Sequence, residues 1–161
     1  MHDIACPRVM ATLKRLPRPK RPTPNSMLPT SSKRGSVLSS KDSTKQSSNG
    51  SPGTYHAAIL AAGAPLVAID EVLAERADNA FCCSRPPGHH AEFNQVMGFC
   101  FFNNIAIAAR YLQSECGIAK VAIVDWDVHH GNGTQHTFES DDTVLFFSIH
   151  QFPHYPGTGA I

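Results

Sequence analysis

The chain has 161 residues, enough to bury one core of ordinary size, and its formal net charge is +1 at pH 7. That value averages two unlike parts, because residues 1–50 carry ten Lys and Arg against two Asp and Glu, whereas residues 51–161 carry four against eleven. Five cysteines without a CxxC spacing argue against a disulfide framework and indicate buried thiols in a reducing compartment. No secretory signal and no apolar run approaching 18 residues is visible, which predicts a soluble folded part.

Residues 1–50 form a basic segment rich in Pro and Ser, which predicts a disordered tail. The segment has few apolar residues and no helical or strand period, so burial cannot offset the entropy of ordering it. Three interpretations remain open: an organelle transit peptide, a nuclear-import or nucleic-acid patch at KRLPRPKRP, and a solvated tail without a specific role. We expect the folded domain to occupy residues 51–161.

The domain begins with an alanine-rich region that predicts two helices. Thr54 is a candidate N-cap, and Pro65 fits the first turn of a second helix after Gly63 and Ala64. Residues 80–84, AFCCS, then predict a short buried strand that ends in the rigid loop RPPG.

Helical and strand patterns alternate through the rest of the chain. Residues 103–117 predict a helix that buries one face and ends at Gly117, and that face carries Ile105, Ala108, Ala109, Leu112 and Cys116. Residues 120–128 and 142–150 are apolar and β-branched, as in strands covered on both faces, and residues 134–138 fit one short helical turn. This alternation indicates an α/β domain with a mainly parallel sheet and helices on both faces, a three-layer α/β/α architecture.

Polar side chains follow each predicted strand at its carboxyl end, where open parallel sheets bind ligands. The first strand leads to His89 and His90, and the second leads to VDWDVHHGNG, residues 124–133. The third is followed by Ser148, His150 and His154.

The aspartates and histidine after the second strand predict a metal site. Along an extended chain, Asp125, Asp127 and His129 point to one side, and their mixed oxygen and nitrogen donors suit zinc or a similar divalent cation. Taken singly, such a residue is more often a turn cap or a surface group, but three ionisable groups on one strand face repel one another unless a cation is present.

The histidine pair after the first strand predicts bases beside this metal. His89 and His90 lie within plausible reach of it, and Asp125 and Asn132 could hold the far nitrogens of their rings, which would set tautomer and orientation. Of the aromatic run after Gly98, we expect a role at the site for Phe99 alone.

Five motifs resemble the zinc-dependent histone deacetylase family in order and spacing. They are RPPGHHA, MGFCFFNNIAIAAR, VDWDVHHGNGTQ, FFSIHQ and YPGTG. The Asn of HHGNG resembles the class II branch. The resemblance covers residues 51–161 and implies the arginase/deacetylase fold in incomplete form.

The resemblance implies a role for each matching residue. Asp127 and His129 would be zinc ligands, His90 the general base and His89 its assisting partner. Asp125 and Asn132 would orient the pair. Gly98 would offer its carbonyl to the substrate amide, while Phe99 and Tyr155 would flank a narrow tunnel for the acyl-lysine side chain.

The resemblance also implies a second cation and the partners. Potassium would lie near zinc, bound by Asp125 and Ser148 together with carbonyl groups of Asp127, His129 and Ile149. A second potassium site would lie near Phe138, Asp141 and Val144. The implied substrate is acetylated lysine in histones or other proteins, which makes the protein a chromatin regulator of the nucleus or cytoplasm, or of an organelle if the basic tail directs it there. Subunits of a deacetylase complex are possible partners, and neither sequence-specific nucleic-acid binding nor membrane association is expected.

The family pattern continues beyond Ile161, with an aspartate as third zinc ligand and a tyrosine or histidine that stabilises the oxyanion. We therefore expect a fragment, a truncated gene model or an isoform whose site is inactive alone. Three alternatives stay open: a deacetylase of acetylpolyamines or other small amides, a non-catalytic fragment that binds the partners of a complete deacetylase, and an arginase-like manganese hydrolase, which His90 and Phe99 disfavour.

Overall fold

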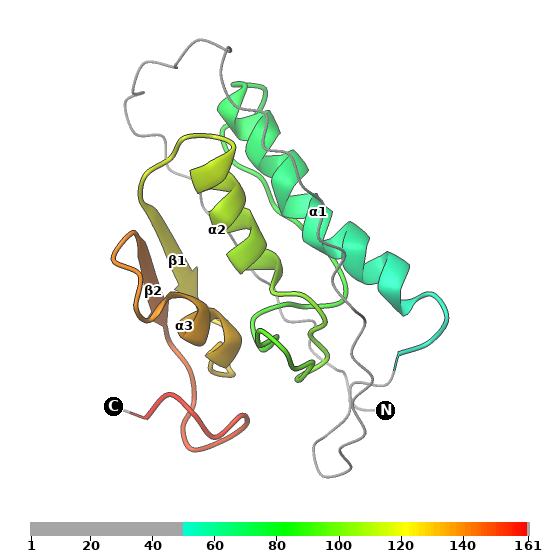
Figure 1. Cartoon of the computed structure of the whole chain (residues 1–161), viewed down its shortest axis with the longest axis vertical. Helices are drawn as coiled ribbons and strands as arrows, with labels where there is room; N and C mark the ends of the chain where they lie inside the picture. Colours follow the sequence, from blue (N-terminus) through cyan, green and yellow to red (C-terminus); the bar gives the residue numbers. More distant parts are fainter. Residues whose placement is uncertain (1–49, 161) are drawn as a thin grey trace. The chain divides into compact units, whose positions relative to one another are not determined.

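The computed structural model describes residues 50–160, and the predictions for the basic tail and for Cys6 lie outside that range. Along the chain the elements are α1 (Thr54–Leu73), α2 (Asn104–Ser114), β1 (Val121–Asp125), α3 (Asn132–Phe138) and β2 (Val144–Ser148). β1 and β2 pair in parallel from Val121↔Val144 to Asp125↔Ser148, and α3 lies in the crossover between them (Figure 1). The parallel sheet with packed helices confirms the predicted α/β class.

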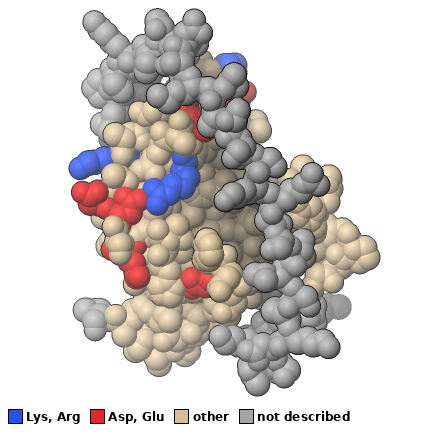
Figure 2. All heavy atoms as spheres, in the orientation of Figure 1, with Lys and Arg blue, Asp and Glu red and all other residues tan. Residues whose placement is uncertain are grey.

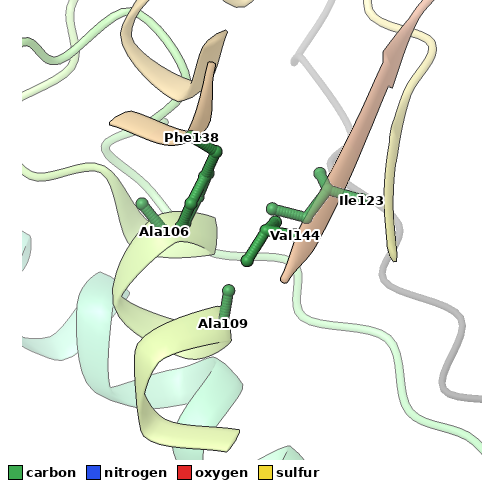
Figure 3. Close-up of a cluster of buried hydrophobic side chains, with 5 residues drawn as sticks. All are labelled: Ala106, Ala109, Ile123, Phe138 and Val144. Atoms are coloured by element: carbon green, nitrogen blue, oxygen red, sulfur yellow. The ribbon is translucent and has the colours of Figure 1, made fainter. Parts of the chain in front are cut away.

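The core lies between the sheet and the helices α2 and α3. One face of the sheet supplies Ile123 and Val144, and these side chains meet Phe138 of α3 and two alanines of α2, Ala106 and Ala109 (Figure 3). Small alanine side chains let α2 approach the sheet closely. A second cluster, formed by Ile69, Ala108 and Leu112, joins α1 to the other side of α2.

The strands are covered on one face only within residues 50–160, which differs from the prediction of two covered faces. Side chains alternate along β1 and β2, and Val124, Leu145 and Phe147 are exposed on the face away from α2. The continuous apolar sequence therefore belongs to strands whose second face is largely exposed within the described residues.

Helix α1 is one helix of 20 residues, so the prediction of two helices was wrong. Pro65 lies inside it and removes one backbone donor, but both halves bury alanine or isoleucine side chains, which favours a continuous helix. The N-cap is Gly53, and Thr54 instead accepts a hydrogen bond from the Ser51 amide at 2.7 Å.

By length and composition alone, α1 is also apolar enough to cross a membrane. The core helix of a water-soluble protein meets the same criterion, and α1 packs on α2 through Ile69. The predicted absence of membrane association stays a prediction.

The short strand predicted at residues 80–84 is not formed. Exposed Phe81 and Cys83 alternate there with half-buried neighbours, but the segment pairs with no strand among the described residues. The apolar pattern therefore predicted a strand wrongly, because strand formation also needs a partner, and local sequence contains no information about one.

Helix α2 was predicted closely. It buries Ala106, Ala108, Ala109 and Leu112, and the side chain of Asn103 caps its first turn by accepting from the Ala106 amide at 3.1 Å. Its C-cap is Glu115 rather than Gly117, which follows with a φ of 69°.

All four described cysteines are free thiols, as predicted, but only Cys100 is buried.

Candidate active site

The two histidines of the first motif lie in the interior, with exposed fractions of 3% for His89 and 4% for His90. The loop before them packs tightly against the start of α2, because a Cβ on Gly88 would meet the Asn104 amide nitrogen at 2.5 Å. On the other side, the His89 carbonyl accepts from the Thr134 amide of α3 at 3.2 Å. The His89 and His90 rings lie side by side, with 4.0 Å between their centroids.

Each ring is held by a different partner. His89 Nδ1 donates to Asp125 Oδ2 at 2.8 Å, and His90 Nδ1 donates to Asn132 Oδ1 at 2.8 Å. Asp125 ends β1 and Asn132 begins α3, so the crossover unit supplies both partners. The predicted contacts to the far ring nitrogens are present, and both imidazoles are left with Nε2 as the atom for further chemistry.

Asp127 and His129 lie next along the chain, and their side chains face the same side as Asp125. Trp126 and Val128 between them are exposed, which is the predicted alternation. The Asp127 carboxylate accepts from the backbone amide of His129 at 2.8 Å, and its Oδ1 lies 3.0 Å from His129 Nδ1. His89 Nε2 lies 3.9 Å from the same Oδ1 atom.

Gly98 and Phe99 form the centre of a tight turn. The Cys100 amide donates to the Met97 carbonyl at 2.9 Å, and both central residues have positive φ, 56° for Gly98 and 63° for Phe99, as in a type I′ turn. The turn presents the Phe99 ring to solvent, with an exposed fraction of 72%. A bulky residue at positive φ is strained, and such strain gathers at functional sites.

Tyr155 reaches the histidines from the segment after β2. Its ring lies 5.1 Å from the His90 ring and 6.0 Å from the His129 ring, both edge-on. Burial raises the pKa of its hydroxyl, an effect opposed by a hydrogen bond from the Gly98 backbone. Tyr155, His90 and Gly98 therefore meet, whereas Phe99 projects outward from the neighbouring position.

Burial makes His90 a neutral imidazole. Desolvation, together with the adjacent His89, lowers the pKa of His90 to about 4, although its hydrogen bond to Asn132 acts in the opposite direction. The Cys100 thiol beneath it is also neutral, because burial raises its pKa to about 12. At neutral pH the His90 ring can therefore accept a proton.

The residues predicted to bind potassium lie where the sheet ends. The Asp125 carbonyl accepts from the Ile149 amide at 2.9 Å, and Ser148 Oγ lies 2.8 Å from His150 Nδ1. At the second predicted site, the Asp141 carboxylate contacts Arg110 at 2.6 Å and accepts from the Thr143 amide at 2.9 Å.

Asp127 and His129 fit part of a zinc site. They offer one oxygen and one nitrogen 3.0 Å apart, a donor set that suits zinc. No group of three or more His, Cys, Asp or Glu side chains between residues 50 and 160 is arranged to hold a metal ion. Since catalytic zinc has three protein ligands, these two residues form an incomplete set.

Sequence reasoning missed several residues of this region. Glu92 contacts Asn132 and His136, and His130 lies between Thr158, 2.8 Å from Nδ1, and Gln135, 2.6 Å from Nε2. The adjacency of Glu92 to the histidine pair was the available signal for the first, whereas nothing local marks the contact between His130 and Thr158.

The sequence matches the family model of the histone deacetylase domain over residues 22–161. Histone deacetylase 4 of Caenorhabditis elegans is 52% identical over 113 residues, which cover 67% of this chain and 13% of that protein. Polyamine deacetylase HDAC10 of Rattus norvegicus is 50% identical over 103 residues, which cover 64% of this chain and 18% of that protein.

Among solved structures, the crystal structure of the HDA15 HD domain is similar, with a TM-score of 0.62 and 50% identity over 65% of this chain and 30% of that one. The chain belongs to the histone deacetylase family, whose members are hydrolases, and a relative in Pseudomonas aeruginosa is named a histone deacetylase-like amidohydrolase. The chain spans less than a third of the length of each relative described above.

Proposed function

We propose that this chain carries part of the catalytic site of a zinc-dependent lysine deacetylase, which hydrolyses acetyl-lysine to lysine and acetate. The observation that supports this most strongly is the pair of buried histidines, each oriented through Nδ1 by a separate partner beside Asp127 and His129. Such an arrangement is what base catalysis by imidazole needs, since one nitrogen is fixed and the other is left to exchange a proton.

In this proposal His90 is the general base. Its neutral ring accepts the proton of the attacking water at Nε2 and returns a proton to the leaving lysine amine. His89, 4.0 Å away between ring centroids, assists electrostatically or by proton transfer, and Asp125 holds its ring in place. The Gly98 carbonyl accepts from the substrate amide, while Phe99 and Tyr155 flank the acyl-lysine chain.

Asp127 and His129 are the residues that would hold zinc, with a further ligand from outside the described residues. A zinc ion held there supplies Lewis-acid polarisation of the amide carbonyl. Asp125 and Ser148 are the proposed potassium ligands, because both lie at the carboxyl end of the sheet beside the same residues.

The proposed substrate is acetylated lysine in histones or other proteins, which implies a role in chromatin regulation and a place in the nucleus or cytoplasm. Acetylated polyamines are a second candidate, because the rat relative is named a polyamine deacetylase. A fragment that binds deacetylase partners without catalysis is a third. The described part of the face drawn in Figure 2 shows charges of both signs side by side, and the absence of sequence-specific nucleic-acid binding stays a prediction.

The proposal is tested by acetate release from an acetyl-lysine peptide with added zinc, by a form of the chain extended through the rest of a histone deacetylase catalytic domain, because Asp127 and His129 alone are an incomplete ligand set. His90→Gln should abolish the release, and His56→Gln, on the exposed side of α1, should preserve it. Release that survives His90→Gln would remove the proposed base. No release from any form would favour the non-catalytic alternative, and faster hydrolysis of acetylspermidine than of the peptide would favour the polyamine substrate.

A further inference from the structure

Glu92 contacts the partner of the proposed base. The Asn132 side chain is buried, with an exposed fraction of 3%, and its two polar atoms have different neighbours. Oδ1 accepts from His90 Nδ1, and Nδ2 donates a short hydrogen bond to Glu92 Oε1. The other neighbours of Nδ2 are the His90 carbonyl at 3.5 Å and Met97 Sδ at 3.4 Å, which are long or weak contacts.

An asparagine amide can be turned over with little change of shape, which exchanges its donor and its acceptor. The carboxylate of Glu92 has no donor, so only Nδ2 of Asn132 can face it. Oδ1 must then face His90, and an acceptor at that place requires the proton of the imidazole to be on Nδ1. The second nitrogen, Nε2, makes no hydrogen bond within residues 50–160 and keeps its lone pair.

We propose that Glu92 is a positioning residue that fixes the orientation of the Asn132 amide and thereby holds His90 as the Nδ1–H tautomer. This inference rests on the proposed function, since it explains how the base comes to have its free nitrogen available to water. With the amide reversed, Nδ2 would donate to Nδ1 of His90, the proton would be on Nε2, and the ring could not accept a proton there.

The position of Glu92 suits this role. Its backbone amide donates to the Gln95 carbonyl at 3.0 Å, so the residue begins a closed turn, with one residue between it and the histidine pair. Its carboxylate also accepts from His136 Nδ1 of α3, at 2.8 Å to Oε1 and 3.0 Å to Oε2. The carboxylate is thus held from both sides, and α3 supplies both of its side-chain partners.

The test is the tautomer of His90 in the whole chain, read from imidazole ¹⁵N chemical shifts and assigned with His90→Gln. Wild type should show the Nδ1–H pattern alone. Glu92→Met keeps a side chain of similar length without an acceptor, and it should lose that pattern in favour of a mixture or of the Nε2–H form. Glu139→Met, at an exposed glutamate after α3, should leave the wild-type pattern unchanged.

A double variant separates positioning from a general structural effect. Asn132→Asp places a carboxylate beside His90 that accepts in either orientation, so Glu92→Met combined with Asn132→Asp should restore the Nδ1–H pattern. A wild-type pattern in Glu92→Met would overturn the inference, and so would failure of the double variant to restore it. Neither reading depends on turnover, whereas absent acetate release would count against the proposed function alone.

Discussion

Replacing Gly98 with alanine should displace His90, because the two residues are in direct contact. A Cβ built on Gly98 would lie 2.2 Å from His90 Cδ2, 2.7 Å from Cγ and 2.9 Å from Cβ. Rotation about χ1 cannot relieve the clash, since the Cβ of His90 is itself too close. The ring must therefore leave its place, and its hydrogen bond to Asn132 should be lost.

Two other glycines serve as controls that separate backbone effects from the clash with His90. Gly63 is inside α1 and Gly117 has a φ of 69°, and an added Cβ at either meets nothing within 4 Å. Gly63→Ala should stabilise the fold by about 0.5–1 kcal/mol through helix propensity. Gly117→Ala should cost about 1–2 kcal/mol through left-handed backbone strain alone.

Gly98→Ala combines that strain, at a φ of 56°, with an overpacking cost of about 1–3 kcal/mol. Its free energy of unfolding should therefore fall about 1–3 kcal/mol below that of Gly117→Ala. Urea denaturation followed by circular dichroism measures both. Equal losses in the two variants would show that His90 does not pack on Gly98 and would refute this description of the site.

Three further changes test other parts of the molecule. Asp141→Asn should lower stability at neutral pH but not in strong acid. Hydrogen bonds from Thr143, together with Arg110, lower the pKa of Asp141 to about 2. The stabilisation that the Asp141 carboxylate contributes is therefore complete above about pH 3.8 and is lost as the pH falls through 2. Thermal melts of both forms from pH 2 to 7 should converge at the acid end, and a constant difference would contradict the assignment. Phe99→Gly should relieve about 1–3 kcal/mol of backbone strain, partly offset by the greater entropy of glycine in the unfolded state. The variant should also bind peptide more weakly, and a fall in its unfolding midpoint would argue against strain at this position. Thr158→Val removes the hydroxyl that contacts His130 at 2.8 Å, and it should shift the ¹⁹F resonance of fluorotyrosine at Tyr155, whereas Thr158→Ser should not; identical spectra would mean that this contact does not position the segment.

The parts of the fold that local pattern determines were predictable. α2 was recognised from the spacing of its buried alanines and leucine, and β1 and β2 were recognised from β-branched and aromatic runs. Residues 80–84, which form no strand, show the limit, because strand formation needs a partner and the local pattern contains no information about one. Pro65 shows another, since tertiary packing on α2 outweighs its local preference to begin a helix.

The candidate site was predictable where strand ends converge. Parallel strands end at one edge, which correctly places Asp125 of β1 beside Ser148 of β2. The histidine motif does meet Asp125, but it arrives there from a loop and not from the strand predicted at residues 80–84. Glu92 and Thr158 could not be expected in the same way, because their contacts depend on how two loops fold over α3. The roles given to His90, Asp127 and the other site residues stay predictions until they are tested.

His89 and His90 are adjacent and identical in type, but they have different hydrogen-bond partners. A dipeptide of two identical residues has no built-in distinction, yet one ring faces an anion at the end of a strand and the other faces a neutral amide at the start of a helix. The two partners come from positions 36 and 42 residues further along the chain. The pair therefore shows how a fold can give two adjacent identical side chains different hydrogen-bond partners, one charged and one neutral, without any difference in the residues themselves.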